Sequence, residues 1–78
     1  QMRNEITRLQ ELVRTDDEII ALRTSVKEAS NVQLENGVIT VNDFLREVNA
    51  EDQARQNKLI HETQLLMTEY SYKTAAGN

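Results

Sequence analysis

The side chains best suited to acid–base or metal chemistry are His61 and the acidic run Asp16-Asp17-Glu18. His61 is the only histidine of the chain, and the positions three and four residues later hold no second metal ligand. A calcium loop needs a glycine and alternating oxygen ligands, which the acidic run lacks. We therefore expect His61 at the surface or at a helix interface, and the acidic run on a solvated face.

The chain offers no other pattern for catalysis. It has no cysteine, its serines belong to no known nucleophile motif, and Gly37 stands alone rather than in a phosphate-binding loop. Tyr70 and Tyr72 lie two residues apart and so point to different sides of a helix, where we expect them to pack against neighbours. The sequence predicts no enzyme, no cofactor and no metal.

Composition indicates that long helices carry whatever function the chain has. Among 78 residues there is no proline, there are two glycines, and only three aromatic side chains are available to fill a core. Charged residues of both signs are interleaved, with a net charge of −4, which argues against a nucleic-acid footprint or an anionic membrane patch. No apolar run approaches the roughly 20 residues that span a bilayer.

The fold class we expect is all-α, an antiparallel two-helix coiled-coil hairpin comprising residues 1–78 and cut from a longer chain. Apolar residues recur every three or four positions over about 2–34, in two sets that are offset near residues 14–18. The offset indicates a stutter that shifts the seam, which is the helix face that packs against the partner helix. A helix break is the alternative. The two sets are Met2, Ile6, Leu9 and Val13, then Leu12, Ile19, Leu22, Val26 and Ala29.

A single turn signal, Glu35-Asn36-Gly37-Val38-Ile39-Thr40, separates the two expected helices. Asn-Gly tolerates the positive φ of a left-handed helix cap, although it also occurs in β-hairpins. The helical period on both flanks favours the helical interpretation over a strand pair. Thr40 with Asp43 three residues later predicts a capping box for the second helix, with Asn42 as an alternative cap.

The second helix, expected over about 41–75, has an apolar stripe with a gap in the middle. From Asn49 to Lys58 it offers only Ala50 and Ala54, which bury little area. An isolated hairpin should therefore pack weakly there, so we expect this helix to lie between several neighbours in a larger assembly. The stripe consists of Val41, Leu45 and Val48, with Phe44 beside them, and then of Leu59, Leu66 and Tyr70, widened by Ile60 and Leu65.

From the turn onward the chain has the residues Asn36-Gly37-Val38, Asp43, Leu45, Asn49-Ala50, Ala54, Tyr72-Lys73, Ala75 and Gly77. With these residues, the second half of the chain, residues 34–78, resembles the periplasmic tip and following helix of TolC-like outer-membrane efflux channels. The first half fits as the preceding long helix by pattern only. The resemblance implies a hairpin from a larger α-helical barrel, in a homotrimer whose tip docks a periplasmic adaptor protein and, through it, an inner-membrane pump. The chain would then be a periplasmic segment of a bacterial outer-membrane protein.

The same resemblance assigns roles at the tip. In that family a hydrophobic-Gly-Thr tripeptide marks the adaptor-facing turn; here Gly37 agrees with it, and Asn36 and Val38 do not. The adaptor-docking residues implied are Leu34, Asn36, Gly37, Val38 and Ile39. The alternative function is a structural coiled-coil spacer or an interaction hairpin of another assembly, such as an adaptor protein.

The family's channel aperture is narrowed by two aspartates one helical turn apart, with a nearby arginine. Asp43 stands in place of the first aspartate, Arg46 in place of the second, and Ile39 in place of the arginine. The gating network therefore does not transfer intact. If these residues form an aperture, we predict an exposed ion pair of modest strength between Asp43 and Arg46.

Overall fold

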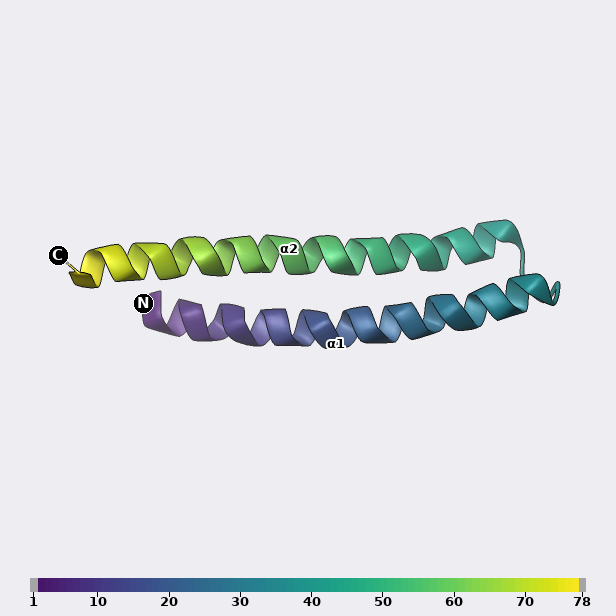
Figure 1. Ribbon diagram of the computed structural model, residues 1–78, viewed down its shortest axis with the longest axis horizontal. Coiled ribbons are helices and arrows are strands. Elements are labelled where there is room, and N and C mark those ends of the chain that lie inside the picture. Colours follow the sequence, from purple (N-terminus) through teal and green to yellow (C-terminus); the bar gives the residue numbers. More distant parts are fainter. Residues whose placement is uncertain (1, 78) are drawn as a thin grey trace.

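Two long antiparallel helices lie side by side and are joined by one short turn (Figure 1). The structure is a computed structural model that describes residues 2–77, and residues 3–75 with their side chains. Helix α1 spans Met2–Glu35 and α2 spans Val41–Gly77, and no strand occurs among the described residues. The predicted helical hairpin is confirmed, with an extent of 62 × 15 × 14 Å.

Helix α1 ends in a Schellman motif built on Gly37. Gly37 has φ 73°, its N–H donates to the Leu34 carbonyl at 3.0 Å, and the Val38 N–H donates to the Gln33 carbonyl at 2.8 Å. These two bonds satisfy carbonyl groups that would otherwise lack partners at the helix end. The expectation that Asn36-Gly37 ends the first helix in a left-handed cap is confirmed.

Helix α2 begins with the predicted capping box. The Asp43 N–H donates to Thr40 Oγ1 at 3.2 Å, and the Thr40 N–H donates to Asp43 Oδ2 at 3.1 Å. Each side chain thus satisfies a backbone donor of the first turn, and the aspartate also lies at the positive end of the helix dipole. Thr40, rather than the alternative Asn42, is the cap.

Helix α1 continues without interruption through the acidic run, so the alternative of a helix break is wrong. The predicted shift of the seam is wrong too, because the same face is buried on both sides of the run. Leu9 and Asp16 are buried and Val13 and Ile20 are half-buried, at steps of four, three and four residues. The second apolar set lies on a neighbouring face, with Leu22 exposed. Asp16 occupies a seam position of the same unbroken heptad, because α2 supplies a polar partner there.

The apolar stripe expected to pack α2 lies largely outside the hairpin. Its exposed members are Val41, Leu45, Leu59, Ile60, Leu66 and Tyr70, whereas Val48 and Leu65 are half-buried. The seam of α2 instead follows steps of three and four from Phe44, through positions that are small or polar in the middle. These seam residues are Phe44, Glu47, Glu51, Ala54, Lys58, His61, Leu65 and Thr68.

Apolar burial in the middle of the rod is as thin as the sequence predicts. Ala54 is the one buried apolar residue of the stretch from Asn49 to Lys58, and polar contacts fill the rest of the seam. The largest fully buried side chain, Leu9, lies toward the open end. The hairpin therefore has a polar centre between more apolar ends.

Candidate interaction surfaces

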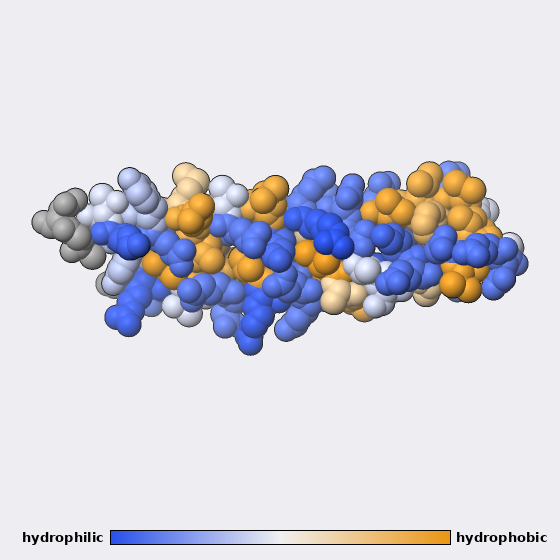
Figure 2. Space-filling view, viewed as in Figure 1, coloured by the Kyte–Doolittle hydropathy of each residue, from blue (hydrophilic) through white to orange (hydrophobic). Residues whose placement is uncertain are grey.

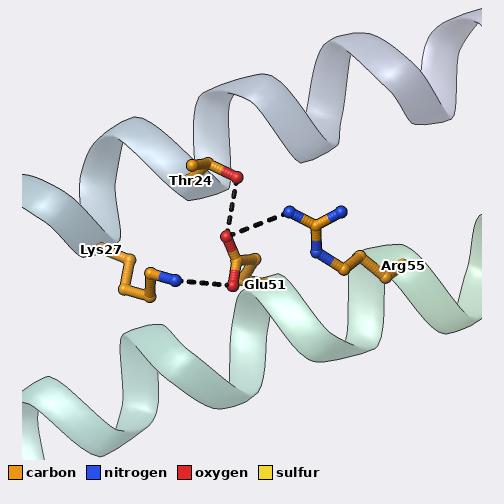
Figure 3. A network of polar contacts seen from close by, with 4 residues as sticks. All are labelled: Thr24, Lys27, Glu51 and Arg55. Carbon is orange, nitrogen blue, oxygen red and sulfur yellow. Dashed lines mark hydrogen bonds and ion pairs between the residues drawn. The ribbon is translucent and has the colours of Figure 1, made fainter.

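A buried carboxylate, that of Glu51, gathers three donors at the centre of the seam (Figure 3). Thr24 Oγ1 donates to Oε2 at 2.7 Å and Lys27 Nζ donates to Oε1 at 3.0 Å, both from α1. Arg55 Nη2, one turn further along α2, lies 3.5 Å from Oε2. The hydrogen bonds from Thr24 and Lys27, with the charges of Lys27 and Arg55, lower the pKa of Glu51 to about 2.

A second polar contact joins the helices closer to the open end. His61 Nδ1 lies 2.5 Å from Asp16 Oδ2, and Asp16 is buried, with 7% of its surface exposed. This distance is that of a hydrogen bond, so the two side chains join α1 to α2. The prediction of a solvated face is wrong for Asp16, whereas placing His61 at a helix interface is confirmed.

Asp17 and Glu18, the rest of the acidic run, are exposed. Asp17 Oδ1 lies 2.6 Å from Lys58 Nζ of α2, and this hydrogen bond raises the pKa of Lys58. Within the described residues no three histidine or acidic side chains gather as a metal site. The acidic run therefore pairs the helices through Asp16 and Asp17.

The Glu51 cluster was missed from the sequence, although a signal for it was present. Continuing the three-and-four spacing from Phe44 reaches Glu51, Ala54 and Lys58, and in an antiparallel pair Glu51 falls opposite Lys27. This alignment of the two helices was not predicted, because only apolar residues were expected in the seam. Matching opposite charges across the two helices would have found it.

The tip presents aliphatic side chains to solvent. Val38 is 68% exposed, Asn36 and Gly37 are exposed, and Leu34 and Ile39 are half-buried. Figure 2 shows apolar side chains gathered at this end of the rod. The five residues assigned to adaptor docking thus lie at the end of α1 and in the turn that follows it, and Val38 is their most accessible apolar member.

The predicted pair between Arg46 and Asp43 forms at the start of α2. Arg46 Nη2 donates to Asp43 Oδ1, while Asp43 Oδ2 accepts the Thr40 N–H. The bond from the Thr40 backbone is the first cause of the lowered pKa of Asp43, and the charge of Arg46 contributes less. Both carboxylate oxygens are therefore engaged, one in the cap and one in an exposed ion pair.

A shallow hollow of about 340 Å³, open to solvent, lies beside the tip. Its lining is mixed in polarity and consists of Lys27, Glu28, Asn31, Val32 and Phe44. Tyr70 is exposed and Tyr72 is 40% exposed, so the hairpin alone gives neither ring a complete packing partner. Neither described helix combines the length and apolar character needed to cross a bilayer.

Comparison with known proteins places the chain in no family, because no family model, no curated protein and no solved structure matches it.

Proposed function

We propose that the chain is the periplasmic coiled-coil tip of a TolC-like outer-membrane efflux channel, which forms part of the export conduit and docks an adaptor protein. The observation that carries the proposal is the inversion of polarity between the seam and the outer faces. Glu51, Lys58 and His61 of α2 point into the hairpin, whereas Leu59 and Leu66 lie on its outside. A helix with this distribution gains most of its apolar burial from other chains or other hairpins.

Adaptor docking at the tip rests on the resemblance of the turn to that family and on the accessibility of Val38. The Schellman motif fixes the backbone of the turn, so the tip meets a partner with little loss of conformational entropy. The role needs no chemistry, only shape, length and an exposed apolar contact. The Asp43–Arg46 pair would line the aperture in this arrangement.

A cross-linking experiment in the full-length parent protein tests this function. Val38→Cys should form a thiol-specific cross-link to a cysteine placed at the hairpin tip of a co-expressed periplasmic adaptor. Gln56→Cys, exposed in the middle of α2, is the matched control. Cross-links at Gln56→Cys but not at Val38→Cys would contradict tip docking and favour the alternative, a coiled-coil spacer.

The sequence of the parent protein offers an independent test. A channel of this family must carry a second copy of the hairpin, together with strands that alternate apolar and polar residues to build the barrel. A parent with one hairpin and no such strands would contradict the channel function.

A further inference from the structure

The turn contains the one asparagine of the chain that is followed by a glycine, Asn36 before Gly37. Asn36 is exposed, and among the described residues no hydrogen bond engages its side-chain amide. The amide of Asn31, one turn earlier, is held instead, because its Nδ2 donates to Glu35 Oε1 at 3.0 Å. The Asn36 amide is therefore free to rotate toward the backbone that follows it.

The backbone nitrogen of Gly37 is not shielded by a side chain. A Cβ at this position would meet no atom within 4 Å, so the space beside the residue is open. Glycine also rotates its backbone with less steric hindrance than any other residue. Asn31 is followed by the β-branched Val32, whose side chain crowds the nitrogen.

An asparagine followed by a glycine loses ammonia through a cyclic succinimide. The Gly37 nitrogen bonds to Asn36 Cγ and gives up its proton, while the Cγ–Nδ2 bond breaks and ammonia leaves. Water then opens the five-membered ring at one of its two carbonyl groups. Opening at Cγ gives aspartate, and opening at the backbone carbonyl gives isoaspartate, whose main chain runs through Cγ and is one carbon longer.

The Schellman motif restrains this reaction in the folded hairpin. The Gly37 N–H donates to the Leu34 carbonyl at 3.0 Å, so this bond must break before the nitrogen can attack. Opening costs little at this end of the rod, because Asn36, Gly37 and Val38 are exposed and bury little surface. The turn can therefore open locally while the two helices stay paired.

From these observations we propose that Asn36 is a site of spontaneous modification, converted to isoaspartate and aspartate by the Gly37 nitrogen when the Schellman motif opens. Both products add a negative charge at the C-terminal end of α1, which is the negative end of its dipole and already holds Glu35. The longer main chain of isoaspartate also prevents the two bonds of the motif from forming together. The inference does not depend on the proposed function.

Mass spectrometry of the folded chain, incubated at neutral pH and sampled over time, measures the conversion. Trypsin releases residues 28–46 as one fragment, in which Asn31 and Asn42 are matched internal controls. Fragmentation should locate the replacement of an amide by a carboxylate at Asn36, severalfold faster than at either control. In guanidinium chloride, which removes the motif, Asn36 should convert severalfold faster again.

Asn36→Gln is the matched control variant, because it keeps an amide that reaches the Gly37 nitrogen only through a larger and less favourable ring. It should stay unconverted over the same time. After incubation the Val38 N–H of the unchanged chain should exchange its hydrogen severalfold faster than before. The Val38 N–H of Asn36→Gln should keep its protection, since its bond to the Gln33 carbonyl is retained.

Three results would overturn the inference. Conversion of Asn36 in the folded chain no faster than that of Asn31 and Asn42 would show that the turn does not permit the attack. Equal rates in the folded chain and in guanidinium chloride would show that the motif does not restrain it. Unchanged protection of Val38 after conversion would show that the products keep the cap. None of these results bears on tip docking, which the Val38→Cys experiment tests separately.

Discussion

Gly37 holds a backbone conformation that other residues adopt only with strain. Its φ of 73° lies in the left-handed region, and a Cβ at this position would meet no atom within 4 Å. Gly37→Ala should therefore lower the free energy of unfolding by about 1 kcal/mol through backbone strain alone. Urea denaturation followed by circular dichroism measures the change.

Gly37→Asn is the control, because asparagine tolerates left-handed conformations better than alanine does. We expect its loss of stability to be the smaller of the two. Equal losses of stability for both variants would mean that the loss does not come from the left-handed backbone conformation of residue 37.

Thr40 contributes to stability through one side-chain hydrogen bond to the first turn of α2. Thr40→Ala removes the acceptor for the Asp43 N–H and should cost about 1 kcal/mol in thermal or urea unfolding. Asn42→Ala, at the alternative cap position, should change stability much less. A larger loss for Asn42→Ala would contradict the capping box.

Glu51 makes the stability of the hairpin depend on acid. Its pKa is lowered to about 2, so the ionised form is stabilised by folding, and this contribution is complete above the ordinary value of 4.5. It is lost as the pH falls from 4.5 toward 2. The unfolding free energy of Glu51→Gln, measured between pH 2 and pH 6, should fall less steeply with acid than that of the unchanged chain.

Glu18→Gln is the matched control, since Glu18 is exposed on the outer surface of α1. Its acid dependence should follow that of the unchanged chain. A Glu51→Gln variant with the same slope as Glu18→Gln would mean that the cluster does not hold the carboxylate in its ionised form.

Helix pairing depends on polar side chains where a coiled coil usually places leucine. Asp16 is buried against His61, so His61→Ala should leave the carboxylate without this partner and cost about 1–3 kcal/mol. Replacing both residues, in Asp16→Leu/His61→Leu, should be neutral or stabilising, because apolar pairs often outperform buried polar ones. Comparing the unfolding free energies of the two variants separates the effect of the Asp16–His61 contact from the effect of filling the seam with side chains.

A double variant less stable than His61→Ala would contradict this account of the seam. It would mean that leucine does not fit between the helices at this level, so that Asp16 and His61 are required for their shape rather than for their mutual contact.

The helices and the turn could be predicted from the sequence because they depend on local signals. Gly37 and the Thr40–Asp43 box act within a few residues, and the absence of proline allows both helices to continue. The inner face of α2 could not be predicted from apolar periodicity. Two faces of α2 have helical periodicity, and the more apolar one, with Leu59 and Leu66, lies outside.

Which face turns inward depends on a partner far away in the sequence. Thr24 and Lys27 make burial of Glu51 favourable, so the choice of seam follows from pairing charges across the helices. Single-helix periodicity contains no information about the residues opposite. The Asp43–Arg46 pair was predictable, in contrast, because its members lie one turn apart on the same helix.

At the scale of the whole molecule the hairpin is a rod 62 Å long. Its outer faces carry more large aliphatic side chains than the seam between its helices. Figure 2 shows apolar patches separated by hydrophilic side chains along the rod. A 78-residue chain with such a small core gains little stability from its own interior. We therefore expect its stability to depend on association with further helices.

Sedimentation equilibrium of the chain over a wide concentration range tests this claim most directly. The account predicts an average mass that rises above the 9.0 kDa of one chain as concentration increases. It also predicts that Ile19→Asn/Leu59→Asn, which leaves the seam unchanged, stays at the mass of one chain. A fully helical, unmodified chain that sediments at 9.0 kDa at every concentration would contradict it.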